Sequence, residues 1–455
     1  MASGEVTDLA GWGNFPVENC TLYRPQGLEE LRSVLGRRQE LDFISRGQGR
    51  SYGDAALNAR RGVILTHGSG EGMHLDTASG TLECLAGTTL AEILDYAVPR
   101  GYSLGITPGT KRISLGGAIA ADVHGKNHHK EGTISHQLLG FSLLTAEGNI
   151  LDCSREENSD LFWATLGGMG LTGVILGVRL ALKASTTAYV TSSNERCRDL
   201  DDVLTRMEEG DRRYDYAVAW IDCLAKGRAL GRSILMRANP AELEDLAPAR
   251  RERPHHVPSR LRPSVPLFLP GWVLNPWSMR AFNAAFYTAH RNQRQILDFD
   301  RYFYALDRVE HWNRVYGRRG ALQYQVVLPS AQAREGLVAL LERIVDRGLA
   351  SFLAVLKTTG PANSSPLSFP IEGVSLALDF PNTGAGLFSL LDDLDAVTLA
   401  HGGRVYLAKD SRLSPENFRA MYPRMDEFNA VKARYDPEGL FSSSLARRIG
   451  LAVNA

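Results

Sequence analysis

The stretch Ser45-Arg-Gly-Gln-Gly-Arg-Ser-Tyr-Gly-Asp54 decides how this chain folds. It begins at the end of a predicted strand, residues 41–45. Glycines at 47, 49 and 53 let the backbone turn tightly and approach a ligand closely. Because successive backbone N–H groups in such a turn form a concavity that binds anions, the stretch predicts a phosphate or pyrophosphate site. The alternative is a glycine-rich surface turn, since short glycine patterns often occur by chance.

Two common phosphate motifs are excluded by spacing. The glycines do not follow the G-x-G-x-x-G spacing of a Rossmann fingerprint with an immediate helix. No Gly-Lys-Ser/Thr follows them, so the stretch is not a P-loop either. The anion site therefore belongs to some other nucleotide- or cofactor-binding fold.

A second stretch downstream has the same character. It consists of Pro108-Gly-Thr110 and then Ser114-Leu-Gly-Gly-Ala-Ile-Ala-Ala-Asp-Val-His-Gly-Lys-Asn-His-His129. Gly116-Gly117 before the small apolar residues predicts the start of a tightly packed helix, a position that favours bound phosphate. Three histidines and a lysine in six residues suggest a metal site as the alternative. His128 and His129 are adjacent and lack a convincing set of acidic or cysteine partners, so we expect no metal.

A third glycine-rich turn, Gly167-Gly-Met-Gly170 followed by Gly173, leads into a strand at residues 174–182. Alone this turn is weak evidence for a ligand site, because short glycine patterns are common. As the third such loop after two phosphate-like loops, it is stronger evidence.

Around these loops the chain mixes helical and strand periodicity, which predicts an α+β fold. The expected helices are residues 90–98, 159–166, 198–209, 331–347 and one capped by Ser414 with Pro415 in its first turn. The expected strands are 41–45, 62–66, 174–182, 216–222, 322–328, 351–356, 374–380 and 404–408, with a hairpin over 141–151. Residues 238–278 contain eight prolines and are read as a mobile surface loop or a lid.

Composition limits the function. The chain has 455 residues, enough for two to three domains, and a formal net charge of zero, which argues against a nucleic-acid partner. Five scattered cysteines suit reduced thiols in a cytoplasmic protein. Residues 1–14 lack a signal-peptide pattern and no run is long enough to span a bilayer. At most, the apolar segment 266–274 predicts a peripheral membrane contact.

The three loops in this order resemble the FAD domain of the vanillyl-alcohol oxidase (p-cresol methylhydroxylase type) superfamily. Further strings resemble the decaprenylphosphoryl-β-D-ribose 2-oxidase family within it, over about residues 12–451. They are His124-Gly-Lys-Asn-His-His129, Leu322-Gln-Tyr-Gln325, Pro366-Leu-Ser-Phe-Pro370, Ala408-Lys-Asp-Ser-Arg412 and Met421-Tyr-Pro-Arg424.

The resemblance implies a two-domain fold with a split FAD domain. Residues 1–188 and 404–455 would bind FAD, and residues 189–403 would form a substrate domain built on an antiparallel sheet. A change in composition and residue pattern near residue 187 indicates the first boundary independently. Relatives with covalent flavin often carry a histidine in the first glycine loop, where this chain has Tyr52, so we expect non-covalent FAD.

The resemblance also implies site residues. Those expected at the cofactor are Ser45, Arg46, Gly47, Gln48, Gly49, Arg50, Ser51, Tyr52, Gly53, Asp54, Gly109, Thr110, Ser114, Gly116, Gly117, Asp122, His124, Gly125, Asn127, Gly170, Gly173, Ile175, Tyr406 and Lys409. Those expected at the substrate are Lys126, Trp220, Tyr304, Gln323, Gln325, Lys357 and Ala377, the last at a position where relatives can carry cysteine.

Lys409, His124 and Tyr52 are the expected catalytic residues. Lys409 would act as a base if burial lowers its pKa, or as a charged stabiliser of developing negative charge if it stays protonated. His124 would anchor the flavin or assist proton transfer.

The expected reaction is oxidation of a secondary hydroxyl on a lipid-linked pentose, the first half of an epimerisation completed by a reductase partner. The same chemistry on a soluble sugar, an aminoglycoside or another natural-product alcohol is the alternative. A third possibility is a flavin-binding protein without catalysis.

Overall fold

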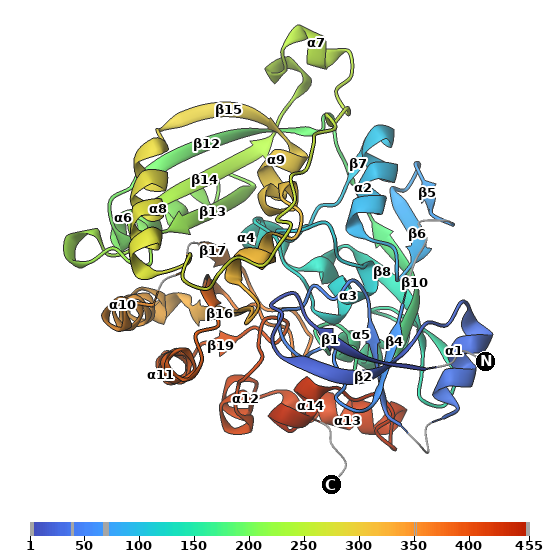
Figure 1. The fold of residues 1–455 in the computed structure, drawn as a ribbon. Coiled ribbons are helices and arrows are strands. Elements are labelled where there is room, and N and C mark those ends of the chain that lie inside the picture. Colours follow the sequence, from blue (N-terminus) through green and yellow to red (C-terminus); the bar gives the residue numbers. More distant parts are fainter. Residues whose placement is uncertain (1–3, 38–40, 67–71, 350, 352, 452–455) are drawn as a thin grey trace.

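The computed structural model describes residues 4–37, 41–66, 72–349, 351 and 353–451, and it shows the expected α+β fold (Figure 1). The predicted strands 62–66, 174–182, 216–222, 322–328 and 374–380 are confirmed to within one residue at each end.

A four-stranded sheet carries the first glycine loop. Its strand order is β1 (Glu5–Ala10), β2 (Val17–Tyr23), β4 (Gly62–Leu65) and β3 (Phe43–Arg46). Strands β2, β4 and β3 are parallel, and α1 (Leu28–Leu35) lies in the crossover from β2 to β3. The loop that begins after Arg46 thus starts at the carboxyl end of a buried strand.

A five-stranded antiparallel sheet follows. Its order is β5 (His74–Asp76), β6 (Thr81–Leu85), β10 (Val174–Ala181), β8 (Leu138–Leu144) and β9 (Ile150–Cys153). A two-stranded ribbon of β7 (Tyr102–Ser103) and β11 (Lys183–Ala184) lies beside it. The helices of this region are α2 (Leu90–Ala97), α3 (Leu115–Ala120), α4 (His128–Glu131) and α5 (Ser159–Thr165). The predicted hairpin over 141–151 is the β8–β9 pair.

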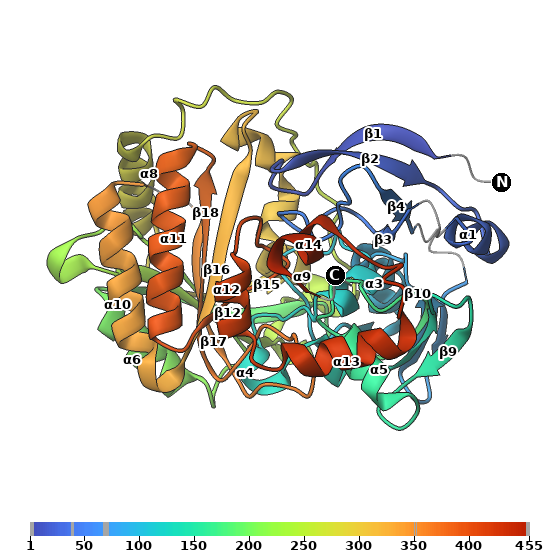
Figure 2. The same cartoon turned by 90° about the horizontal axis from the view of Figure 1, so that it is seen from below.

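The third sheet has eight antiparallel strands. In order they are β15 (Gln293–Asp298), β12 (Tyr189–Cys197), β14 (Ser233–Pro240), β13 (Tyr216–Ile221), β17 (Ala354–Thr359), β18 (Gly373–Pro381), β16 (Ala321–Pro329) and β19 (Arg404–Val405). Helices α10 (Ser330–Arg347) and α11 (Ala385–Ala400) cover one face, and α6 (Leu200–Gly210) packs next to α10. Figure 2 shows the first two sheets on the opposite side, so the other face of this sheet looks toward the glycine loops.

The end of the chain returns to the first sheet. Helices α12 (Pro415–Met421), α13 (Met425–Tyr435) and α14 (Ser444–Ile449) follow β19. Ser414 caps α12 by accepting from the Asn417 N–H at 3.1 Å, with Pro415 in the first turn as predicted. Near α14, Phe441 forms a β-bridge with Phe43 of β3. The domain limits at 188/189 and 403/404 remain a proposal.

Three sequence predictions need correction. The strand predicted over 404–408 ends at Val405, because the chain turns there and the Lys409 and Asp410 N–H groups donate to the Tyr406 carbonyl. The strand predicted over 351–356 is β17, shifted to later residues; residue 352 lies outside the described residues.

The third correction concerns the proline-rich region. It is not one irregular loop, since α7 (Pro248–Arg251) lies within it and α8 (Pro276–Ala289) begins near its end. Asn275 caps α8 and Pro276 occupies its first turn, so here a proline starts a helix. None of the described helices is long and apolar enough to cross a membrane.

Candidate active site

The first glycine loop presents a run of free backbone donors. Within the described part of the chain, the N–H groups of residues 47–51 have no hydrogen-bond acceptor. A Cβ atom on Gly47 would lie 2.0 Å from the Ser114 Oγ atom, so a larger residue would have to displace the Ser114 side chain that caps α3. The Ser45 hydroxyl is buried and has no hydrogen-bond partner among the described residues. Unpaired buried polar groups are costly, so this loop has the form of an anion cradle.

The two arginines of this loop are held by the protein itself. The Arg46 guanidinium donates to the carbonyls of Ala10, at 2.7 Å, and Ala56, at 3.2 Å. The Arg50 guanidinium lies over the Trp12 ring, 4.2 Å from its centroid. They supply positive charge close to the loop while their positions are fixed.

Gly53 and Asp54 fasten the loop to the chain around Lys409. A Cβ on Gly53 would lie 1.9 Å from the Asp410 carbonyl oxygen. Asp54 and Asp410 both pair with the Arg448 guanidinium, at 2.7 and 2.9 Å. These two predicted cofactor residues therefore hold the site together in this structure.

The start of α3 differs from expectation. The Gly116 N–H donates to the Ala86 carbonyl at 2.7 Å, and the Gly117 N–H donates to the Ser114 hydroxyl at 3.3 Å. These N–H groups are thus satisfied internally and are not available to a phosphate. Ser114 is a helix cap, and the glycines allow α3 to pack tightly.

The loop at 107–111 is tethered to the eight-stranded sheet region. Thr107 and Tyr304 share a hydroxyl–hydroxyl hydrogen bond of 2.6 Å, and the Thr110 hydroxyl donates to Asp307 at 2.7 Å. A Cβ on Gly109 would meet no atom within 4 Å, so this glycine borders open space. Tyr304, expected as a substrate wall, has its hydroxyl committed to this loop.

Gly125 and Asn127 shape the turn before α4. A Cβ on Gly125 would lie 2.7 Å from the Thr107 carbonyl oxygen, and the Asn127 amide donates to the Gly105 carbonyl at 2.6 Å. Both predicted cofactor residues fix the backbone between the second glycine stretch and the substrate side.

Asp122 is fully buried and only half satisfied. Its Oδ2 atom accepts from the Asn363 amide and the Ser368 hydroxyl, each at 2.6 Å. Its Oδ1 atom has no partner among the described residues. Burial raises the pKa of this carboxyl. Asp122 therefore links the second glycine stretch to the 363–368 segment.

The third glycine loop packs on the end of α3. The Met169 N–H donates to the Ala120 carbonyl at 2.9 Å, and Gly170 has a φ of +80° that favours glycine. A Cβ on Gly173 would lie 2.6 Å from the Leu144 carbonyl oxygen. Ile175, on β10, is partly exposed.

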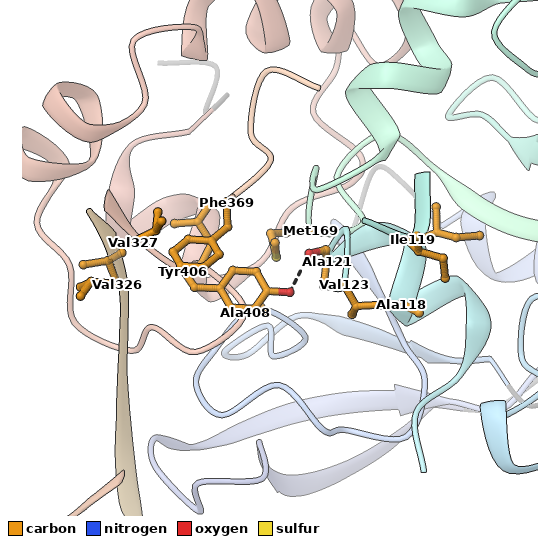
Figure 3. Close-up of a cluster of buried hydrophobic side chains, with 14 of the residues drawn as sticks. Ala118, Ile119, Ala121, Val123, Met169, Val326, Val327, Phe369, Tyr406 and Ala408 are labelled. Atoms are coloured by element: carbon orange, nitrogen blue, oxygen red, sulfur yellow. Dashed lines mark hydrogen bonds between the residues drawn. The ribbon is translucent and has the colours of Figure 1, made fainter. Parts of the chain in front are cut away.

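Tyr406 joins the two halves of the site through its ring and its hydroxyl. The hydroxyl donates to the Ala121 carbonyl at 2.7 Å, and the ring stacks on Phe369 with centroids 4.6 Å apart (Figure 3). His124 packs against the same ring, 5.4 Å between centroids. Phe369 belongs to the Pro366–Pro370 string, so that string acts by packing.

His124 is a neutral, buried imidazole. Its Nε2 atom lies 3.1 Å from the Gln325 amide, while its Nδ1 atom has no partner among the described residues. Burial, with nearby Lys357, lowers the pKa of His124 well below its usual value. His128 accepts from the Gly360 N–H through Nδ1 at 2.8 Å, and burial lowers its pKa to about 3. No group of three metal-binding side chains occurs within the described residues.

Predicted substrate residues form a row across the large sheet. The strand register places Trp220 opposite Val355, Val355 opposite Ala377, and Ala377 opposite Gln325. Residues opposite one another in a ladder share a face of the sheet. Gln325 contacts His124, so this face is the one turned toward the second glycine stretch.

The same register brings Lys357 and Gln323 to this face, because each lies two residues from a member of that row. The row ends at Trp220, whose ring packs on Phe286 of α8 with centroids 4.7 Å apart. Five predicted substrate residues are thus brought together: Trp220, Gln323, Gln325, Lys357 and Ala377.

Lys409 enters the site from the turn after β19. Its Nζ atom lies 4.4 Å from the centroid of the Tyr52 ring, and burial lowers its pKa to about 8. Lys357 has its pKa lowered to about 8 by burial and by the charge of Lys409. For Lys126, burial and then Lys357 lower the pKa to about 7. These three lysines, 126, 357 and 409, are called the lysine cluster below.

The lysine cluster lacks the partners that a structural lysine has. Buried Lys432 donates to two backbone carbonyls, at 2.8 and 2.9 Å, and pairs with Asp436. Lys126 donates to the Tyr302 carbonyl, but neither Lys357 nor Lys409 has a hydrogen-bond or ion-pair partner among the described residues. Buried charges are normally paired, so the cluster is built to receive an anion or to lose a proton.

Asp379 is a site residue that sequence reasoning missed. This fully buried carboxylate accepts from the Tyr52 hydroxyl at 2.9 Å, the Tyr316 hydroxyl at 3.1 Å and the Gln323 amide. It also raises the pKa of Lys409 against the lowering effect of burial. Tyr52 itself has its pKa raised well above 10 by burial, so it stays protonated and positions rather than accepts protons. Asp379 is the only charged residue of the predicted strand 374–380, and this was the only local signal.

These features fit a cofactor with a pyrophosphate group. The free donors of residues 47–51 suit the phosphates, and the buried unpaired atoms of Ser45, Asp122 and His124 lie along the loops that would surround the rest. The sheet face with the lysine cluster is left for a substrate.

Comparison with known proteins agrees with this arrangement. Residues 22–154 match the family model described as FAD binding domain, and residues 388–449 match that described as D-arabinono-1,4-lactone oxidase. The chain is 35% identical to decaprenylphosphoryl-beta-D-ribose oxidase of Mycolicibacterium smegmatis over 97% of both chains. It is 28% identical to L-gulonolactone oxidase of Bos taurus, over 41% of this chain and 43% of that protein. FAD is therefore the cofactor, and the enzyme class is that of FAD-dependent oxidoreductases acting on alcohol groups.

Proposed function

The chain belongs to the family of decaprenylphosphoryl-beta-D-ribose oxidase, and from this premise we propose that it oxidises a secondary hydroxyl of a phosphate-linked pentose to a carbonyl. The lysine cluster is the observation that carries the substrate class. A phosphodiester beside the sugar would give Lys357 and Lys126 the negative partner that the described residues do not provide.

FAD held by the glycine loops would supply a hydride acceptor for the carbinol carbon. The hydroxyl proton must go to a base, and Lys409 suits that task because its pKa of about 8 leaves part of it neutral near neutral pH. Asp379 accepts a hydrogen bond from the Tyr52 hydroxyl and raises the pKa of Lys409 against the effect of burial. Neutral His124 and Gln325 position the polar groups of the sugar or cofactor beside it.

The same cluster argues against a cationic substrate. An aminoglycoside would bring positive charge next to three lysines, which like-charge repulsion opposes. No feature of the site favours a neutral soluble sugar over a phosphate-linked one. A flavin protein without catalysis is disfavoured by the buried, unpaired Lys409.

FAD is proposed to be held without a covalent bond. The first glycine loop carries Tyr52 at the place where a histidine often makes the link in relatives, and its hydroxyl is occupied by Asp379. Acid precipitation should leave the flavin spectrum in the supernatant. Flavin that remains in the pellet would contradict this part of the proposal.

The product is a keto sugar that still carries its phosphate linkage. A carbonyl made from a secondary alcohol completes an epimerisation only if a reductase reduces it from the other face. We propose such a reductase as a functional partner and a cytoplasmic site of action.

The test compares two substrates in one anaerobic titration. A phosphate-linked pentose should bleach the flavin, and a pentose with a free anomeric hydroxyl should do so far less well. Lys357→Gln should raise KM for the phosphate-linked substrate about tenfold or more with a smaller change in kcat, since it removes a charge-assisted contact. Equal use of both pentoses by the wild type and by Lys357→Gln would refute the substrate class.

A further inference from the structure

A serine outside the predicted site residues lies between two of them. Ser375 is fully buried on β18, and the strand register places it opposite Lys357 of β17. Gln325 of β16 lies opposite Ala377, two residues further along β18. Residues opposite each other, and residues two apart, share a face of the sheet, so Ser375 faces the second glycine stretch together with Lys357 and Gln325.

The Gln325 side chain is held by two hydrogen bonds from its amide nitrogen. The Nε2 atom lies 3.1 Å from the His124 Nε2 atom and 3.4 Å from the Ser375 hydroxyl oxygen. An amide nitrogen only donates, so both of these atoms accept. The Oε1 atom of Gln325 has no hydrogen-bond partner among the described residues. Ser375 therefore turns the amide nitrogen toward His124 and leaves the carbonyl oxygen for a bound molecule.

This arrangement fixes where His124 carries its proton. Burial, with the charge of nearby Lys357, lowers the pKa of His124 well below its usual value, so the ring is neutral and holds one proton. Because Nε2 accepts from Gln325, that proton lies on Nδ1. The Nδ1 atom is buried and has no partner among the residues that the structure describes. A buried N–H group without an acceptor is costly, so the Nδ1–H is placed for an acceptor on a bound molecule.

The neighbouring histidine has the opposite tautomer. His128 accepts at Nδ1 from the Gly360 N–H at 2.8 Å. Burial lowers the pKa of His128 to about 3, so this ring is neutral too and its proton lies on Nε2. The rings of His124 and His128 are 6.0 Å apart between centroids. The two buried rings thus take opposite tautomers because each faces a donor at a different ring nitrogen, and the donor to His128 does not involve Ser375.

We propose that Ser375 is a positioning residue that keeps His124 in the Nδ1–H form through the Gln325 amide. The site then presents one donor, the His124 Nδ1–H, and one acceptor, the Gln325 Oε1 atom, at fixed places beside the lysine cluster. Without the Ser375 hydroxyl, the amide can rotate by half a turn and offer its oxygen to His124, and the ring proton moves from Nδ1 to Nε2. The donor is then used inside the protein, and the reacting molecule is held less well. The effect on turnover rests on the proposed oxidation, whereas the tautomer does not.

The test reads the tautomers by NMR in the FAD-loaded full chain with isotope-labelled histidine, since a ring nitrogen with a proton differs in chemical shift from one without. Wild type should show His124 with Nδ1–H and His128 with Nε2–H. Ser375→Ala should give both forms of His124, and Gln325→Glu, whose ionised carboxylate only accepts, should place a proton on Nε2. Ser375→Thr retains the hydroxyl and should match wild type. The matched control is Ser192→Ala, another buried serine of the same sheet, whose hydroxyl has no partner among the described residues and whose loss should change neither histidine.

In anaerobic single turnover, Ser375→Ala should reduce the flavin about threefold to tenfold more slowly than wild type, as expected for one lost hydrogen bond, with unchanged FAD content. Ser375→Thr should restore most of the rate. A wild-type His124 protonated at Nε2, or a Ser375→Ala variant with the wild-type tautomer, would overturn the proposal, and so would a change of tautomer that leaves the rate the same. A tautomer shift in a protein whose flavin no pentose reduces would refute the proposed oxidation alone and support the positioning of His124 by Ser375. His128 should keep its Nε2–H form in every variant, which shows that the variants are folded.

Discussion

The substitution Asp379→Asn tests how the site sets the basicity of Lys409. It removes one buried negative charge while keeping the shape of the side chain and one acceptor for the Tyr52 and Tyr316 hydroxyls. A nearby anion stabilises the protonated lysine, so its removal must lower the pKa of Lys409 from its wild-type value of about 8.

The magnitude follows from the geometry. The Lys409 Nζ atom lies 4.4 Å from the Tyr52 ring centroid, and the Tyr52 hydroxyl lies 2.9 Å from Asp379. For a charge separation on the order of 7 Å and an effective dielectric constant of about 20, Coulomb's law gives about 2 kcal/mol. The pKa of Lys409 should therefore fall by roughly one to two units. The part of the pH–rate profile that Lys409 controls should move to lower pH by the same amount.

The assay is the pH dependence of flavin reduction under anaerobic single turnover. If neutral Lys409 is the base, the wild-type rate rises with pH through about 8, and the Asp379→Asn rate rises at lower pH. If Lys409 acts in its charged form, the rate instead falls with pH, and the fall also moves to lower pH. Tyr316→Phe is the control, since it removes a hydrogen bond to Asp379 but no charge. An unchanged pH dependence of flavin reduction in Asp379→Asn would refute the reasoning. Asp379 would then be uncharged or would not interact with Lys409.

Three further predictions follow from the same contacts. Lys409→Gln should retain FAD and lose turnover by about a hundredfold or more, as expected for a general base, and near-normal turnover would remove Lys409 from the mechanism. Gly47→Ala should reduce the bound flavin fraction, because its Cβ would collide with the Ser114 Oγ atom, while Gly386→Ala, where a Cβ meets nothing within 4 Å, should purify with full flavin. Arg448→Met should lower the unfolding free energy by about 3 kcal/mol or more, since it leaves Asp54 and Asp410 buried without their shared cation; an unchanged melting midpoint would contradict this.

The parts of the site that could be predicted were those with a local signal. Gly47, at a close approach to Ser114, could be recognised from the glycine pattern, and Lys409 could be recognised from the string around it. The alternation of Gln323 and Gln325 in a strand pattern was enough to place both on one face. What the sequence could not give was pairing between strands, and so it could not show that Ala377 and Trp220 belong to one row.

The residues that were missed or misjudged depend on long-range contacts. A charged residue in a buried strand is a weak signal, and Asp379 becomes a site residue only because Tyr52, more than three hundred positions earlier, donates to it. The N–H groups of Gly116 and Gly117 had the local form of a phosphate site, yet Ala86 and Ser114 satisfy them. Helix α8 was hidden because proline content was taken as a sign of irregular chain, whereas Pro276 lies at a helix start.

The lysine cluster makes substrate charge part of the catalytic balance. The charge of Lys409 lowers the pKa of Lys357. Like-charge repulsion acts in both directions, so charged Lys357 favours the neutral form of Lys409 in the free enzyme. A phosphate bound at Lys357 is an anion close to Lys409 and must raise the pKa of Lys409. The apparent pKa in the pH profile of kcat reports the substrate complex, and that in the profile of kcat/KM reports the free enzyme. The first should therefore be higher than the second. A neutral sugar would leave the two pKa values together, so their separation measures whether a charged phosphate lies in the site.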